Sequence, residues 1–395
     1  MGRTASTVIP PFASAQDVKD TYALRRDIRG LDGQCPDEPA GRKRLQDLYP
    51  RDGFNSLQDL ERDISGLVGV SSSKLLAYSS GMTAIVSAIE SAHPTSGTTI
   101  LMGQDHYTET PRYVDDHLRP RGVKVVKVDS GDPKAVKRAI DRNSPDIILF
   151  ETVANGTGMP VLDTISLFRA LSSGKRTLVV LDNTLPTPTL APPEALLDEN
   201  GAQVVVVVES GTKSYALNSE MLGILYTSNS ELWTRLFSGR VTIGNAPTPS
   251  SVDTIRRNLP PSKREFDSRN RKIFRNTLAL AQACLLATED SGNLIVVHPN
   301  LPGHPNYSLA QAINHEGTSP VFYINNMTDQ FKLTDLLFED PVIRQYCEIS
   351  QSFGFGNTRI YPYYGNTYVR IAGGAAPVEE IEEISAALTR ALKRT

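Results

Sequence analysis

Five consecutive valines, Val204 to Val208, constrain the fold of this chain more than any other segment. A run of β-branched apolar residues is typical of a strand that is buried on both faces of a parallel sheet. The run ends at a small, hydroxyl-rich turn that carries one lysine, Lys213. Ligands of open α/β sheets bind just beyond the carboxyl ends of strands, so Lys213 could serve there as a Schiff-base nucleophile. Taken alone, the segment favours the simpler interpretation of an exposed lysine in a loop.

An alternation of strands and helices surrounds this segment. It predicts an α/β fold in which a mostly parallel sheet is sandwiched by helices. The predicted strands cover residues 74–78, 99–102, 124–128, 146–151, 177–182, 203–208 and 221–227. Helices are predicted between most of them, at residues 82–91, 107–118, 133–141, 163–173 and 192–200.

The flanking segments divide the chain into three predicted parts. Residues 1–55 form an arm with one short helix at 17–29, and their charge, Pro and Gly content gives them no core of their own. Residues 56–250 form the large domain, whose first helix is predicted to start with Ser56 as its N-cap. Residues 251–395 form a smaller α/β domain with a long basic helix at 254–286. Its other predicted elements are strands at 294–298, 319–324 and 368–371 and a closing helix at 378–394.

Composition excludes several classes of protein. A net charge of -3 over 395 residues gives no electrostatic reason to expect nucleic acid or an anionic membrane as a partner. The three cysteines are widely spaced and the six histidines lack zinc-motif spacing, which predicts a reduced protein without a disulfide framework or metal site. We find no signal-peptide pattern and no apolar window of transmembrane length, so we expect a cytoplasmic protein.

Four polar features follow the predicted strands. Ser80-Gly81-Met82 can bind an anion through free helix N–H groups, or can be only a tight turn. Tyr107 can stack on a planar ligand or transfer protons, or can simply pack. Asn155 can contact a ligand oxygen, or can belong to an ordinary Asn-Gly turn. Asp182 ends an apolar strand, where its carboxylate needs a cation or strong donor, or caps a helix.

Together these features match the requirements of pyridoxal phosphate. That cofactor needs a Schiff-base lysine, an acid at its ring nitrogen, an aromatic side chain over the ring and donors for its phosphate. All four would lie at one edge of the predicted sheet.

The chain resembles the Cys/Met-metabolism family of pyridoxal-phosphate enzymes, which includes cystathionine γ-synthase, cystathionine γ-lyase and methionine γ-lyase. The match covers roughly residues 45–228 and extends more weakly to about 375. Its motifs are the family's Ser-x-Thr-Lys, Asp-Asn-Thr and Ser-Gly-Met sequences, present as Ser210-Gly211-Thr212-Lys213, Asp182-Asn183-Thr184 and Ser80-Gly81-Met82. The resemblance implies the fold type I architecture. It also implies that Lys213 is the Schiff-base lysine, that Asp182 pairs with the ring nitrogen, and that Ser210 and Thr212 bind the phosphate together with the Ser80 turn.

Further motifs imply an assembly and a substrate site. Tyr49-Pro50-Arg51 resembles the family's Tyr-x-Arg, which reaches the phosphate of a neighbouring subunit and so implies a homodimer as the minimal active unit and a homotetramer as the assembly. Tyr107 is similar to the family tyrosine over the ring, a candidate general acid, and Asn155 to the asparagine at the ring hydroxyl. Arg370 resembles the arginine that holds the substrate α-carboxylate, and Ser352 lies in a looser match to a substrate loop.

The chain departs from the family mainly around the substrate. Ser214 follows the lysine where Tyr is usual, and Asn218-Ser219-Glu220 replaces a His-Ser-Asp trio. The resemblance therefore implies γ-replacement or γ-elimination on a γ-substituted, homoserine- or methionine-like L-amino acid, with a non-standard substrate in specialised metabolism. The alternative is β-elimination on cystathionine- or cysteine-type substrates, and a scaffold protein without cofactor is more remote. The sequence does not specify the leaving group, the nucleophile or the pathway.

Overall fold

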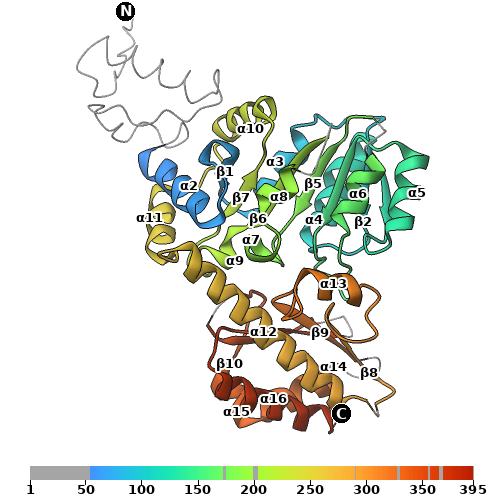
Figure 1. The fold of residues 1–395 in the computed structure, drawn as a ribbon, viewed down its shortest axis with the longest axis vertical. Helices are drawn as coiled ribbons and strands as arrows, with labels where there is room; N and C mark the ends of the chain where they lie inside the picture. Colours follow the sequence, from blue (N-terminus) through green and yellow to red (C-terminus); the bar gives the residue numbers. More distant parts are fainter. Residues whose placement is uncertain are drawn as a thin grey trace, which may run out of the picture.

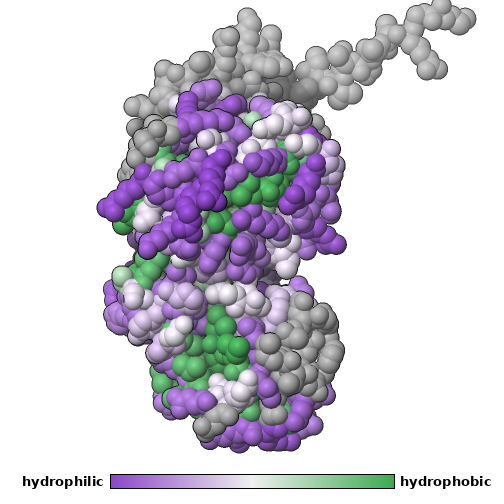
Figure 2. All heavy atoms as spheres, turned by 90° about the vertical axis from the view of Figure 1, so that its right-hand side faces the viewer, coloured by the Kyte–Doolittle hydropathy of each residue, from purple (hydrophilic) through white to green (hydrophobic). Residues whose placement is uncertain are grey.

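The computed structural model describes residues 54–171, 175–198, 203–289, 291–326, 330–354, 356–363 and 368–394. Two sheets organise these residues, one in each of two lobes separated by a narrower waist (Figures 1 and 2). The long helix α12 (Lys263–Ala287) extends from one lobe into the other (Figure 1). The predicted arm helix at 17–29, Tyr49 and Arg51 lie outside the described residues. The three-part division of the chain stays a prediction.

The large sheet confirms the predicted fold class. Its seven strands lie in the order β1-β7-β6-β5-β4-β2-β3, and only β7 runs antiparallel to its neighbours. Their bounds are β1 (Leu75–Tyr78), β2 (Thr99–Gly103), β3 (Lys124–Val128), β4 (Ile147–Glu151), β5 (Leu178–Asp182), β6 (Val204–Ser210) and β7 (Gly223–Tyr226).

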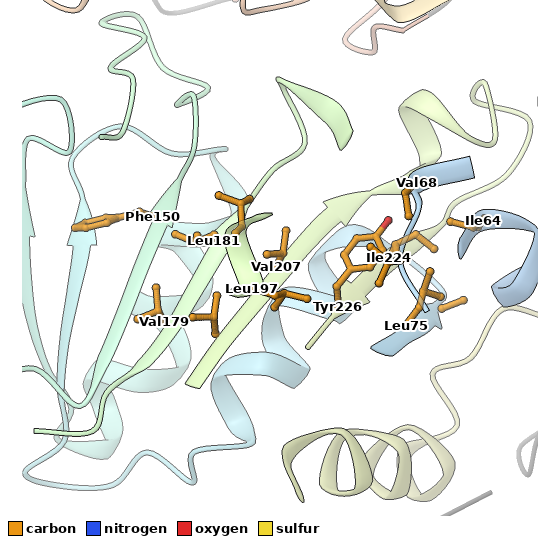
Figure 3. Close-up of a cluster of buried hydrophobic side chains, with 14 of the residues drawn as sticks. Ile64, Val68, Leu75, Phe150, Val179, Leu181, Leu197, Val207, Ile224 and Tyr226 are labelled. Carbon is orange, nitrogen blue, oxygen red and sulfur yellow. The ribbon is translucent and has the colours of Figure 1, made fainter. Parts of the chain in front are cut away.

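Helices cover both faces of this sheet and explain the valine run. Val205 and Val207 pack on one face, while Val206 and Val208 pack on the other, so the valine run of β6 has no face for polar residues. Figure 3 shows side chains of neighbouring strands on the first face, among them Phe150, Val207 and Tyr226. The first face is covered by α2 (Asn55–Val68), α5 (Pro133–Asn143), α6 (Thr164–Leu171) and α8 (Pro193–Asp198). The second is covered by α3 (Gly81–Glu90), α4 (Glu109–Tyr113), the π-helical turn η3 (Val114–Leu118) and α10 (Ser230–Ile243).

Two helix predictions are wrong. Helix α2 starts one residue before Ser56, and its N-cap position is Phe54, which makes no side-chain capping bond. The single basic helix predicted at 254–286 is two helices, α11 (Pro249–Asn258) and α12. The intervening residues include Pro260 and Pro261, which lack the N–H that a continuing helix requires, and Ser262 then caps α12.

The small sheet has five strands in the order β10-β11-β12-β9-β8. They are β8 (Leu294–Val297), β9 (Val321–Asn326), β10 (Cys347–Ile349), β11 (Thr358–Pro362) and β12 (Tyr368–Ala372). Its aliphatic face packs on α12, α14 (Gln330–Glu339), α15 (Pro341–Tyr346) and α16 (Val378–Leu392). Strands β10 and β11 were not predicted. In β11 and β12, Tyr361 and Arg370 lie directly opposite each other on the face away from this core.

Two searches of the described residues gave no candidates. Among the helices described, none is long and apolar enough to cross a bilayer. No group of three or more His, Cys, Asp or Glu side chains in the described part of the chain could hold a metal ion. Cys284 is buried and Cys347 is half-buried, and both are free thiols.

Candidate active site

Lys213 lies in α9 (Gly211–Ser214), the single helical turn that follows β6. Burial, and then the positive charges of Arg370 and Arg359, lower the pKa of its amine from 10.5 to about 8. Its Nζ lies 5.6 Å from the centre of the Phe353 ring. Because the amine is half-neutral near pH 8, it can act as a nucleophile or base close to neutral pH.

Asp182 lies at the buried end of β5, next to β6 in the sheet. Its Oδ1 accepts hydrogen bonds from the backbone N (2.9 Å) and Oγ1 (2.5 Å) of Thr184, so Asp182 stabilises its own turn and caps no helix. Thr184 Oγ1 in turn accepts from the backbone N of Ser210 at 2.9 Å. Burial, and then the negative charge of Glu151, raise the pKa of Asp182 to about 7. A cation beside this carboxyl would offset both effects.

The turn Ser80-Gly81-Met82 begins α3 and faces the end of β6. Ser80 Oγ caps the helix at the backbone N of Thr83, at 3.1 Å. The N–H groups of Gly81 and Met82 have no acceptor within the helix and can bind an anion. A Cβ on Gly81 would lie 3.0 Å from the Cα and Cβ of Ser210, so only glycine lets these two segments approach this closely.

Thr212 connects the turn that carries Lys213 to Leu222, the residue directly before β7. Its backbone N donates to Leu222 O at 3.0 Å, and its Oγ1 accepts from Leu222 N at 2.9 Å. The hydroxyl also lies 3.3 Å from Leu222 O, to which it can donate. The Thr212 hydroxyl therefore contacts Leu222, while the Thr212 carbonyl oxygen accepts from the backbone N of Asn218 at 2.8 Å.

Glu151 positions the two residues that were predicted to face the cofactor ring. Its two carboxylate oxygens accept from the backbone N of Tyr107 and of Asn155, each at 2.6 Å. The Tyr107 side chain is 43% exposed. Burial, and then the charges of Glu109 and Tyr363, raise the pKa of Tyr107, so its hydroxyl keeps its proton at neutral pH. A protonated phenol of this kind can act as a general acid.

Arg370 lies in the middle of β12 and is almost fully buried. One guanidinium nitrogen donates to Gln351 O, and the group lies 5.5 Å from the Tyr363 ring centre and 6.0 Å from that of Phe353. Tyr323 lies opposite Arg370 in the register of β9 and β12, and its hydroxyl donates to Asn155 Oδ1 at 2.8 Å. This chain of contacts connects Arg370, from the small sheet, to the large-sheet edge that carries Lys213 and Asp182.

The loop with Ser352 packs directly on the lysine turn. Ser352 Oγ donates to Asn218 Oδ1 at 3.0 Å. Gly354 has a φ of 91°, and a Cβ there would lie 3.1 Å from the carbonyl oxygen of Lys213. Two segments that depart from the family sequence, around Asn218 and Ser352, therefore contact each other.

Comparison with known proteins gives the family. A family model described as Cys/Met metabolism PLP-dependent enzyme matches residues 34–354. The chain belongs to this family. It is 30% identical over 217 residues to a probable cystathionine gamma-synthase of Herpetosiphon aurantiacus, covering 55% of this chain and 63% of that protein. It is also 32% identical over 190 residues to the cystathionine beta-lyase MetC of Bacillus subtilis, covering 48% and 45%. The matches thus span less than two thirds of these relatives' lengths.

A solved structure gives the fold independently. The crystal structure of metB from Corynebacterium glutamicum superposes with a TM-score of 0.74 at 21% identity, covering 93% of this chain and 92% of that one. At this identity the likeness shows the fold alone. The fold type I architecture predicted from the sequence is confirmed.

Pyridoxal phosphate is the cofactor of this family, and the chemistry of the described donors fits it. Lys213 offers an amine of lowered pKa that forms no hydrogen bond or ion pair with the residues described. Both hydrogen bonds to Asp182 end on Oδ1, which leaves Oδ2 for the ring nitrogen. The first turn of α3 offers backbone N–H groups for the phosphate. Lys213, Asp182 and Ser80-Gly81-Met82 would hold these three parts of the cofactor.

Several site residues were missed by sequence reasoning. Tyr323, Arg359 and Tyr363 come from strands or strand ends of the small sheet. Arg359 bonds to Glu348 at 2.6 Å and to Ser350 Oγ at 3.0 Å. The alternation of Arg359, Tyr361 and Tyr363 in β11 and just after it was the available signal.

Proposed function

We propose that the chain catalyses γ-replacement or γ-elimination on a γ-substituted L-amino acid, homoserine- or methionine-like but of non-standard structure. The observation that carries this proposal is that Lys213 and Arg370 both lie against the Phe353 ring, with Tyr107 interacting electrostatically with Arg370. A base, a carboxylate receptor and a general acid thus converge at one edge of the large sheet. Family membership supplies the cofactor.

Each residue then has a defined task. Arg370 binds the substrate α-carboxylate, and its packing against Tyr363 and Phe353 orients the guanidinium. Lys213, as the neutral amine, removes the proton from Cα, gives this proton up again, and in its regenerated neutral form removes one from Cβ. Asp182 keeps its negative charge beside a protonated ring nitrogen. Tyr107 gives a proton to the leaving γ-substituent. When bound, the cofactor supplies an aldehyde that condenses with amines and a ring that withdraws electrons from Cα.

β-Elimination on cystathionine- or cysteine-type substrates is the second candidate. It is supported by the similarity to a relative named cystathionine beta-lyase. The same base and carboxylate receptor serve this reaction, because it needs only the removal of the Cα proton and the loss of a group from Cβ.

Product analysis separates the two functions. The purified protein loaded with pyridoxal phosphate is given matched pairs of γ-substituted and β-substituted amino acids, with and without a thiol nucleophile. We expect a four-carbon keto acid or a γ-replacement product from the first set. A three-carbon keto acid from the second set alone would reject the γ-reaction. Lys213→Ala serves as the control and should lose both turnover and the visible absorbance of the bound cofactor.

We also propose a homodimer as the minimal active unit, a homotetramer as the assembly, and a cytoplasmic location. Family membership supports the assembly, because Tyr49-Pro50-Arg51 resembles the family motif that reaches the phosphate of a neighbouring subunit. Light scattering of the purified protein tests it. A monomer that retains full activity would contradict it.

A further inference from the structure

A buried polar row lies directly behind the candidate site. In the parallel register Glu151 pairs with Asp182, and Asp182 with Val208. The next residues along the three strands are Thr152, Asn183 and Glu209, which therefore lie side by side and point to the opposite face of the sheet. All of these are buried, with Asn183 fully enclosed. We call Thr152, Asn183 and Glu209, with Tyr215 and Tyr226, the buried row.

Glu209 is the centre of the buried row. Its Oε1 accepts from Asn183 Nδ2 at 2.8 Å. Its Oε2 accepts from the hydroxyls of Tyr215 at 3.0 Å and Tyr226 at 3.1 Å, and these hydroxyls lie 3.1 Å apart. Asn183 Oδ1 accepts from Thr152 Oγ1 at 3.0 Å, which extends the row to the end of β4. One carboxyl group therefore connects the ends of β4, β5, β6 and β7.

Two partners of Glu209 are close in sequence to the cofactor residues. Asn183 directly follows Asp182. Tyr215 is two residues beyond Lys213, its backbone N donates to Gly211 O at 3.1 Å, and its ring stacks on Phe266 at 5.2 Å. Aliphatic residues would fill this space without the cost of burying a carboxyl group. Stability alone therefore does not explain a glutamate here.

We propose that Glu209 is a positioning residue for the cofactor site: through Asn183 and Tyr215 its carboxyl group fixes Asp182 and the turn of Lys213 relative to each other. The inference rests on the roles given to Lys213 and Asp182 under the proposed function, and not on the identity of the substrate. Burial raises the pKa of Glu209 to about 8, although its hydrogen bonds with Asn183 and the two tyrosines act to lower this pKa. The hydrogen bonds described for the carboxyl group are all made with side chains of the buried row.

Tyr215→Phe and Tyr226→Phe form a matched pair that tests the proposal. Each removes one buried hydroxyl from the same carboxylate oxygen, but only Tyr215 belongs to the lysine turn. The first measurement uses cofactor-free protein, in which the pH dependence of Lys213 acetylation is followed by mass spectrometry. The second is the affinity for pyridoxal phosphate, followed by visible absorbance. Neither measurement depends on turnover, so failure of the proposed reaction would not affect them.

We expect Tyr215→Phe to raise the pH midpoint of Lys213 acetylation by about half a unit, as the loosened turn admits water. It should also weaken cofactor binding about fivefold, the effect of one lost hydrogen bond. Tyr226→Phe should change both by much less. Equal changes in the two variants, or no change in Tyr215→Phe, would overturn the proposal.

Variants of Glu209 itself add a second arm. Glu209→Gln keeps an acceptor for Asn183 and a polar group for the tyrosines, so it should keep cofactor affinity within about threefold. Glu209→Leu removes all three bonds and should weaken the affinity more than tenfold. Equal affinities for the two folded variants would contradict the positioning role. If Glu209→Leu does not fold, the comparison of Tyr215→Phe with Tyr226→Phe still tests the positioning role.

Discussion

Replacing Lys213 by methionine should stabilise the cofactor-free protein at neutral pH. The fold opposes the charge of this buried amine through burial and the neighbouring Arg370 and Arg359. Methionine has a similar length and no charge, so the variant removes this penalty and keeps most of the packing against Phe353.

The size of the effect follows from the pKa. In the folded protein the pKa of Lys213 is about 8, against 10.5 as the ordinary value. This difference corresponds to about 3 kcal/mol of free energy of unfolding as an upper figure. Between these two values the unfolded chain holds a proton that the folded chain has lost, so stability rises with pH. The penalty is therefore complete below pH 8 and absent above the unfolded pKa.

Chemical denaturation at pH 7 and pH 10.5 measures this effect. Cofactor-free wild type, Lys213→Met and Lys134→Met, a control at an exposed position on α5, are compared at both pH values. We expect Lys213→Met to be more stable than wild type by up to about 3 kcal/mol at pH 7. The difference should shrink towards zero at pH 10.5. A difference that is the same at both pH values, or a destabilised variant at pH 7, would refute the reasoning.

Three further predictions concern Asp182, Arg370 and Tyr107. The folded pKa of Asp182 is about 7, above its ordinary value of 3.8, so the cofactor-free protein should lose stability as pH rises through this window. Asp182→Asn should abolish that loss in pH-dependent unfolding and weaken cofactor binding by about 2–5 kcal/mol in titrations. Arg370→Gln should lower kcat/KM by a similar free energy, mainly through KM, with cofactor absorbance unchanged. Tyr107→Phe should lower kcat about 10²–10⁴-fold in steady-state assays, with KM nearly constant. A variant of Arg370 or Tyr107 with wild-type kinetics would exclude that residue from its role.

The large-sheet half of the site could be predicted because its residues sit at the ends of strong local patterns. Asp182 and Lys213 each follow an uninterrupted apolar strand, and Ser80 begins a helix directly after another. Parallel strands place their carboxyl ends at one edge, so these segments converge without any knowledge of contacts. Pro260 and Pro261 also mark the break between α11 and α12, but the basic residues continue on both sides of it and imitate one long helix.

The small-sheet half depends on pairings that local patterns do not specify. Tyr323 lies opposite Arg370 only because β9 and β12, more than forty residues apart in sequence, pair in this register. Strands β10 and β11 are short, and only in β11 do the side chains alternate between buried and half-buried positions. Glu209 was visible as an acid after the valines, but its partner Tyr226 lies on a strand that pairs antiparallel to β6. The partners of such residues can be identified only when the register of the paired strands is known.

The two titrating groups of the site explain why the cofactor and the fold are suited to each other. Burial raises the pKa of Asp182 and lowers that of Lys213, so both groups tend towards their neutral forms in the cofactor-free protein. A ligand with a ring nitrogen that gains a proton and an aldehyde that consumes an amine relieves both penalties at once. The buried row keeps these two groups at fixed positions from behind, whereas the contact between Ser352 and Asn218 lies beside the lysine turn. The lysine turn is therefore contacted from both sides, since Asn218 also bonds to Thr212 and Gly354 lies against Lys213, so divergence around Asn218 and Ser352 alters the surroundings of Lys213 more directly than those of Asp182.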